Sequence, residues 1–240
     1  MFLVVSYLIF KMDLKPGSSF GIVGAVGRGE STQVMHIPQH LTNALSTAAT
    51  SITAEGELPA ATRKDLLQLI EALSVTEHAD AGYLRRARLA VICAREVLGR
   101  LSPYPSVLTA AEAILASGID ALSGKCDFPT LEIANGEYHT KVIDLFQHGE
   151  PAFVSVYAGM AVFSAMNTIL YDTNFDVVGE SEQSVPPDDW DAGYYGALAV
   201  SGSAIWEAKG GAERRRSYWL WYLQNAAPVA WDVLVPLRRD

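Results

Sequence analysis

An uninterrupted stretch of 21 residues without a charged side chain, 151–171, restricts the fold of this chain more than any other segment. A helix of about 20 apolar residues is long enough to cross a bilayer. The centre of a large helical bundle also requires a helix that is apolar on all sides. The stretch contains Ser155, Ser164, Asn167 and Thr168, and the neighbouring segments are amphipathic. We therefore expect a buried central helix rather than a membrane span.

From about residue 38 onward, segments with apolar residues at helical spacing alternate with Pro and Gly. This periodicity and punctuation are typical of successive helices. No alternating strand series and no internal repeat interrupts the pattern. The sequence therefore predicts a mainly α, single-domain multi-helix bundle over 35–240. The expected helical segments are 37–56, 59–73, 80–99, 103–124, 129–149, 151–171, 188–210 and 213–231.

Local signals give expectations for the ends and faces of three helices. Asn135-Gly136 weakens the segment 129–149 and is expected to split it. Asp188 or Asp189 is expected to cap the helix that follows the loop 172–187. The helix over 80–99 has two faces. One is apolar and contains Leu84, Ala87, Val91, Ile92 and Ala94; the other contains Arg85, Arg86, Arg88 and Arg95.

The first 34 residues differ from the rest and predict a short N-terminal extension that is strand-like or irregular. They begin with nine apolar residues, Phe2–Phe10, a run too short to span a bilayer as a helix. A secretory signal would carry a positive residue before the run and a small-residue cleavage site after it, and neither is present. We therefore expect a cytoplasmic protein, with Met12 or Met35 as alternative start positions.

A glycine-rich segment over 21–32 resembles the phosphate-binding loop of P-loop ATPases. Gly24, Gly29 and Ser31 stand at the spacing of that motif. However, Glu30 occupies the position of the phosphate-binding Lys, and no strand ending in a magnesium-binding Asp follows. The segment is therefore interpreted as a glycine-rich turn, and the alternative is a degenerate nucleotide-binding or regulatory protein.

The charge of the chain is concentrated in one region. Its 18 Lys and Arg against 27 Asp and Glu give a net charge of −9, which disfavours nucleic-acid binding. No Lys or Arg lies between Val142 and Ala208, and most acids of this window lie in or beside the expected loop 172–187. These acids are interpreted either as a solvated loop or as a docking surface for a basic protein. They are Asp172, Asp176, Glu180, Glu182, Asp188, Asp189 and Asp191.

Residue patterns typical of catalysis or metal binding were not found. The five His residues are scattered, the acids do not match a calcium-binding loop, and H-E-x-x-H does not occur. Cys93 lies among apolar residues, which predicts a buried structural thiol, and Cys126 lies in an expected loop. The sequence therefore predicts a protein that is no enzyme and that has no catalytic residue, cofactor or metal.

The C-terminal segment 188–231 is rich in aromatic residues, which cover more than one face of the last helix and predict core packing. An exposed ridge, or the lining of a small-molecule pocket, is the alternative. The segment, together with Leu89–Ala94, resembles the Imm5-like family of immunity proteins from bacterial polymorphic toxin systems, although Tyr218 replaces an expected Phe. The matching residues are Arg215 or Arg216, Trp219, Trp221, Tyr222, Leu223, Pro228 and Trp231.

This resemblance covers roughly residues 35–231 and implies binding rather than catalysis. Proteins of this kind neutralise a cognate toxin, and a nuclease toxin would be basic because its substrate is a polyanion. We therefore expect an acidic surface on this chain to bind a toxin protein, with no nucleic-acid or membrane partner.

Overall fold

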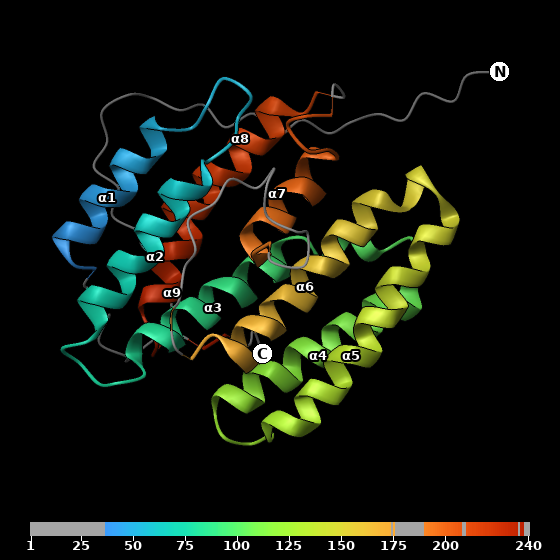
Figure 1. The fold of residues 1–240 in the computed structure, drawn as a ribbon, viewed down its shortest axis with the longest axis horizontal. Helices are drawn as coiled ribbons and strands as arrows, with labels where there is room; N and C mark the ends of the chain where they lie inside the picture. The colour runs from blue at the N-terminus through green and yellow to red at the C-terminus, as the bar shows by residue number, and fades with distance from the viewer. Residues whose placement is uncertain (1–36, 174, 176–189, 208–209, 235, 238–240) are drawn as a thin grey trace, which may run out of the picture. The chain divides into compact units, whose positions relative to one another are not determined.

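The computed structural model describes residues 37–173, 175, 190–207, 210–234 and 236–237 (Figure 1). The predicted mainly α class is confirmed, since the described residues form helices and contain no strand. The N-terminal apolar run, the glycine-rich segment and the expected boundary after residue 34 lie outside the described residues. The predictions made for them therefore stay predictions.

The helices of the described chain follow one another with short connections. Three short 3₁₀ segments lie between them, η1 (Leu98–Leu101), η2 (Asp144–His148) and η3 (Glu150–Ala152). The α-helices are α1 (Gln39–Thr50), α2 (Ala60–Ser74), α3 (Ala81–Glu96), α4 (Pro105–Leu122), α5 (Phe128–Ile143), α6 (Phe153–Tyr171), α7 (Ala192–Ser201), α8 (Ala212–Trp221) and α9 (Ala227–Trp231).

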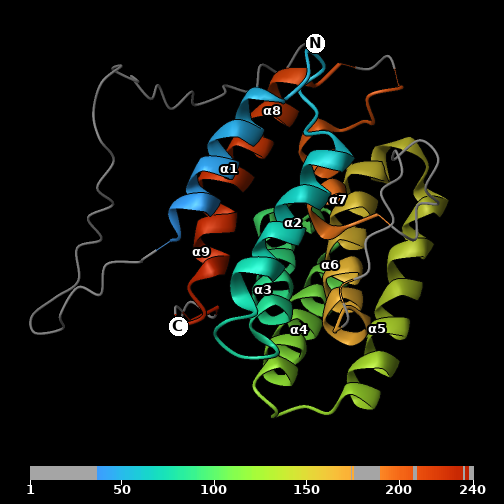
Figure 2. The same ribbon diagram turned by 60° about the vertical axis from the view of Figure 1, so that its left-hand side comes forward.

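The uncharged stretch forms α6, which is the central helix of the bundle. It packs against α3, α4, α5 and α7, and two views show it among them (Figures 1 and 2). Both α4 and the segment 150–171 are long and apolar enough to cross a membrane, but 61% of the second is buried within the protein. Neighbouring helices cover most of α6, which explains why it carries no charge.

Small residues allow the neighbours of α6 to approach closely. A Cβ atom on Gly159 would lie 2.7 Å from both methyl groups of Val142 on α5. At the edges of the bundle, α1 packs against α2 and against the segment that joins α8 to α9, and α4 and α5 pack together (Figure 2). The helix α3 joins these parts, because it packs against α2, α6, α7 and α9.

The C-terminal helix continues past Pro228, although a proline ordinarily interrupts a helix. A π-helical segment, Tyr222–Ala226, joins α8 to α9. Proline cannot donate the backbone hydrogen bond of a regular helix, and its ring clashes with the carbonyl one turn before it. A π turn absorbs such a local mismatch without ending the helix.

The structure corrects three expectations about helix ends and breaks. Helix α5 runs unbroken through Asn135-Gly136, where the buried Asn135 amide donates to the Asn167 side chain on α6 at 2.9 Å. The cap of α7 is Asp191 rather than Asp188 or Asp189, because its carboxylate accepts from the Tyr194 backbone N–H at 2.7 Å. Helix α7 ends at Ser201 and not near 210.

The polar face expected for α3 is directed into the protein. Arg85, Arg86 and Arg88 are all buried, and only Arg95 is half-buried. Arg85 donates to the Trp231 carbonyl at 3.0 Å and to the Ser74 hydroxyl at 2.7 Å. Arg85 and its neighbours thereby link α3 to the chain segments around it.

Candidate partner-binding surface

The window without Lys or Arg, 142–208, is one continuous region of the folded chain. Its described part consists of η2, η3, α6, α7 and the turn over 202–207. Helices α6 and α7 pack directly on each other, and η2 and η3 lie against the start of α6. The lack of Lys and Arg in this part of the sequence therefore also holds for one region of the folded protein.

Two of the seven acids proposed for partner binding are ion-paired within the protein. The Asp191 carboxylate, besides capping α7, accepts from Arg63 Nε at 3.1 Å. Asp172, just after α6, accepts from Arg86 Nε at 3.0 Å. Burial raises the pKa of Asp172, and Arg86 acts in the opposite direction. These two carboxylates stabilise the fold, so they are poor candidates for a partner contact.

The other five proposed acids lie outside the described residues. They are Asp176, Glu180, Glu182, Asp188 and Asp189. Their role in partner binding stays a prediction.

The buried charged side chains of the described residues are mostly positive. Among the described residues, five Arg side chains are buried, whereas Glu57 is the only buried Asp or Glu. Each of the five donates to at least one backbone carbonyl, and cannot contact a partner. The surface is therefore more acidic than the net charge of −9 suggests. The buried arginines are Arg63, Arg85, Arg86, Arg88 and Arg215.

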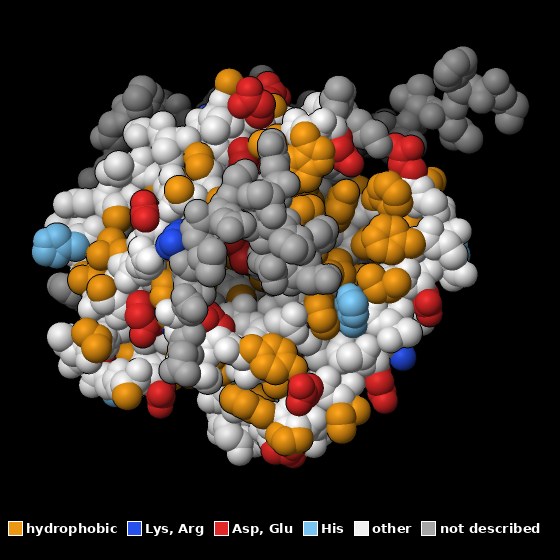
Figure 3. Space-filling view, in the orientation of Figure 1, with side chains coloured by type: hydrophobic (Ala, Val, Ile, Leu, Met, Phe, Trp, Pro, Cys, Tyr) orange, Lys and Arg blue, Asp and Glu red, His pale blue; other side chains and the backbone are white. Residues whose placement is uncertain are grey.

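Exposed aromatic and aliphatic side chains gather in the same window. Phe146 in η2 is 48% exposed, Trp206 after α7 is 46% exposed, and Ile205 beside it is 37% exposed. Phe153 and Tyr157 at the start of α6 are half-buried. We call these five residues the aromatic face. Hydrophobic side chains gather where α6 begins and α7 ends, bordered by acids (Figure 3).

The sequence pattern does not indicate the aromatic face. Ile205 and Trp206 lie within the expected helical segment 188–210, because their spacing from Trp190 is roughly helical. In the structure the helix stops earlier, at Gly202, whose φ of 84° suits glycine. The sequence signal for this stop was Gly202 between Ser201 and Ser203, a pattern typical of helix ends.

The C-terminal motif belongs to the core. Trp219, Tyr222, Trp231 and Arg215 are buried, and Trp221 is half-buried. Arg215 donates to the carbonyls of Glu55 at 2.8 Å and Ser203 at 2.5 Å, and lies 3.5 Å from the Glu57 carboxylate.

The guanidinium of Arg63 lies over the ring of Trp219, 5.1 Å from its centroid, and that of Arg85 lies 3.5 Å from the centroid of the Trp231 ring. Such contacts fix the last helix against α2 and α3, and they give the Arg and Trp residues of the motif a structural role.

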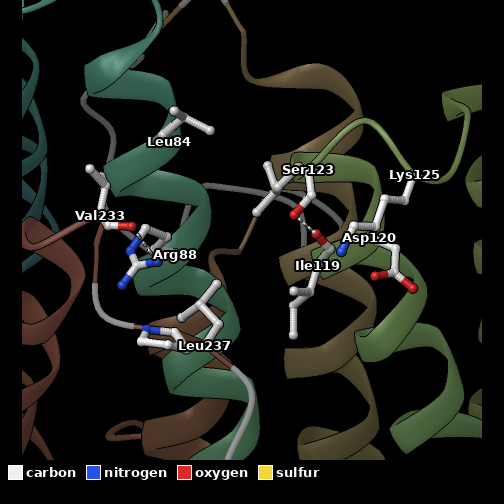
Figure 4. Close-up of a pocket in the computed structure, with 10 residues that line it drawn as sticks. Leu84, Arg88, Ile119, Asp120, Ser123, Lys125, Val233 and Leu237 are labelled. Atoms are coloured by element: carbon white, nitrogen blue, oxygen red, sulfur yellow. Dashed lines mark hydrogen bonds between the residues drawn. The ribbon is translucent and has the colours of Figure 1, made fainter.

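A cavity of about 430 Å³ lies between α3, the end of α4 and the C-terminal tail (Figure 4). Leu84, Ile119 and Leu237 supply apolar walls, and Arg88 and Lys125 are its cationic residues. Arg88 donates to the carbonyls of Ala230, Asp232 and Val233, which occupy its guanidinium. None of the C-terminal aromatic residues lines this cavity.

Groups that could support catalysis are not assembled in the described part of the chain. No cluster of three or more His, Cys, Asp or Glu residues suited to a metal ion is found there. Cys93 is buried, and burial raises the pKa of its thiol, which opposes formation of a nucleophilic thiolate.

A comparison with known protein families shows to which family this chain is related. The family described as Immunity protein Imm5 matches residues 46–229, which is most of the chain. The chain belongs to the Imm5 immunity protein family. A search of curated proteins found no match. Membership supports an immunity function, and the matched region contains α2 to α8 together with Arg215 and Trp219 of the C-terminal motif, whereas Trp231 lies just beyond it.

Proposed function

We propose that this protein binds and neutralises a basic toxin, possessing no catalytic activity of its own. The proposal rests on the acidic region 142–208, which lacks Lys and Arg. This region contains α6 and α7, and these two helices pack on each other. An acidic surface attracts a cationic protein and accelerates its association. A nuclease is the class of toxin that fits best, because its substrate site binds a polyanion. We propose that the complex forms in the cytoplasm.

The five acids outside the described residues belong to this proposal, whereas Asp172 and Asp191 do not. The carboxylates of the latter two are bound to Arg86 and Arg63. If these carboxylates turned to bind a partner, the buried guanidinium groups of Arg86 and Arg63 would lose these contacts, and the fold would lose stability. We therefore assign the toxin contacts to the remaining acids and to the surface around them.

The small-molecule alternative depended on a pocket among the C-terminal aromatics. Trp219 and Tyr222 are packed in the core, and the cavity that Tyr222 lines beside Cys93 and Asp191 has a volume of only about 100 Å³, which favours a structural role for them. The nucleotide-binding alternative rests on residues 21–32, which lie outside the described residues.

The test is co-expression of the full chain with the toxin domain encoded beside its gene. We expect the chain to restore growth of cells that produce the toxin, and to form a complex whose dissociation constant rises with salt. Continued toxicity together with the absence of a complex would contradict the proposal.

Two charge-matched variants then locate the contact. In the first, five acids of the window are changed to their amides, and we expect binding to weaken by about tenfold or more. In the second, five exposed acids elsewhere are changed, and we expect a smaller effect because only long-range attraction is lost. The first set is Asp176, Glu180, Glu182, Asp188 and Asp189; the control set is Asp65, Asp80, Glu112, Glu137 and Glu213.

A further inference from the structure

The exposed apolar residues of the aromatic face adjoin one another. The rings of Phe146 and Phe153 are 5.9 Å apart, and Tyr157 follows Phe153 by one helical turn on α6. A Cβ atom on Gly202 would lie 3.9 Å from the Val154 side chain, so the end of α7 lies against the first turn of α6. The Glu207 carboxylate also contributes, after burial, to raising the pKa of the Tyr157 hydroxyl. Ile205 and Trp206 directly precede Glu207. The face therefore joins η2, the first turns of α6 and the turn after α7.

Apolar side chains that are exposed as a group indicate a binding site more strongly than apolar side chains that are exposed singly. Single exposed Val or Leu side chains are common on protein surfaces, but grouped aromatic residues mark interaction sites. Aromatic side chains are also enriched in protein interfaces, where they supply much of the binding energy. The half-buried positions of Phe153 and Tyr157 hold this part of the face on the rigid α6.

Three acids of the window lie close to residues of this face along the chain. Asp144 precedes Phe146, Glu150 precedes Phe153, and Glu207 follows Trp206. Arg214 approaches the end of α7, where its guanidinium donates to the carbonyls of Val200 and Ser201. Lys and Arg side chains are few on this side of the molecule and lie away from the gathered hydrophobic side chains (Figure 3).

We propose that the aromatic face, Phe146, Phe153, Tyr157, Ile205 and Trp206, is the central contact for the toxin. The inference rests on the proposed function and specifies its surface. The partner is a basic protein that places apolar side chains on these rings and Lys or Arg side chains on the acidic rim. A second copy of this chain fits poorly, because its own rim would carry the same charge.

The division of roles follows from the physical chemistry of the two kinds of group. Desolvated aromatic contacts slow dissociation, whereas charges at a solvated rim mainly accelerate association. The acids are thus expected to govern how fast the toxin binds, and the rings how long it stays bound.

A pair of Lys substitutions tests the proposal against the toxin domain encoded beside the gene. Phe146→Lys places a cation in the aromatic face, and Val75→Lys places one at the end of α2, where Val75 is 69% exposed. Both variants change the net charge by the same amount, so their long-range attraction for the toxin is nearly equal. We expect Phe146→Lys to weaken binding by about tenfold or more and Val75→Lys by about twofold or less.

A second substitution removes apolar surface without adding charge. Trp206→Ala is expected to raise the dissociation rate by about tenfold and to leave the association rate within about twofold. Circular dichroism and thermal unfolding of each variant will show that the fold is retained. The side chains are about half exposed, which favours this.

The outcomes separate this inference from the function it rests on. If the unaltered chain neither binds nor rescues, the proposed function fails. If it binds, but Phe146→Lys and Trp206→Ala bind as tightly as Val75→Lys, the function stands and the aromatic face is rejected. Dimerisation of the free chain that Trp206→Ala abolishes would show that a second copy covers the face, and would also reject the toxin contact.

Discussion

Buried arginines hold this molecule together through backbone carbonyls. Arg63 donates to Leu58 at 2.8 Å, Arg86 to Asp172 at 2.7 Å, and Arg215 to Glu55 and Ser203. A guanidinium group has five donors in a fixed plane, so it can satisfy several carbonyls that helix ends leave free. Glu71 and Glu77 add carboxylate partners for Arg86 and Arg85. Lysine at these positions would leave carbonyls without donors.

Asp191 gives a test of one such ion pair. Asp191→Ala removes both the cap of α7 and the contact with Arg63, and we expect the free energy of unfolding to fall by about 2 kcal/mol. Asp191→Asn retains a capping oxygen and should cost about half as much. Urea unfolding of both variants provides the measurement. Equal losses would mean that the cap contributes nothing.

The two thiols should differ in reactivity. Cys93 is buried and the pKa of its thiol is raised, whereas Cys126 is partly exposed. In the folded protein we expect a thiol reagent to modify Cys126 within minutes and Cys93 only after unfolding. The Cys126→Ser variant should then show no rapid reaction. Rapid modification of that variant would contradict the burial of Cys93.

At the scale of the helices, close packing depends on where glycine is placed. Gly159 lets α6 approach Val142 on α5, and Gly196 on α7 faces the Tyr218 hydroxyl of α8. Gly136 differs, because it lies on the exposed side of α5 and a Cβ there would meet nothing within 4 Å. Identical substitutions should therefore have opposite effects on stability.

Two Gly→Ala variants test this contrast. Gly136→Ala should stabilise the protein by about 1 kcal/mol, since alanine restricts the unfolded chain and favours the helix. Gly159→Ala should destabilise it by about 1–3 kcal/mol, because the added methyl group overlaps Val142. Thermal unfolding of both proteins supplies the comparison. Stabilisation by Gly159→Ala would show that α5 and α6 separate at little cost.

At the scale of the whole molecule, charge is distributed radially as well as along the chain. Five arginines of the described residues lie in the interior, Glu57 is the only acid buried with them, and the region 142–208 contains no Lys or Arg. Such a distribution produces an attractive field for a basic partner over distances of about a Debye length.

This field should make toxin binding sensitive to salt. Between about 0.05 M and about 0.5 M NaCl, we expect the association rate constant to fall by about tenfold or more. The dissociation rate should change less, because the rings of the aromatic face carry no charge. Stopped-flow mixing with the toxin domain measures both rates. An association rate that does not respond to salt would exclude electrostatic attraction.

The sequence by itself determined the helical class and the central position of 151–171. Local periodicity and the absence of charge are sufficient for both, because a helix without charge must be buried by other helices. The C-terminal residues were also sufficient to indicate the Imm5 relationship, which the match over 46–229 shows.

Only the tertiary structure decided which polar residues lie inside. Arg85, Arg86 and Arg88 look like a solvent face by periodicity, and Asp172 and Asp191 look like surface acids. Each is instead bound to a residue or carbonyl on another segment, as far as 146 positions away for Arg85 and Trp231. Spacing along a helix says nothing about such partners. A charge can be buried where folding supplies its counter-charge and its hydrogen bonds, and these come from distant parts of the chain.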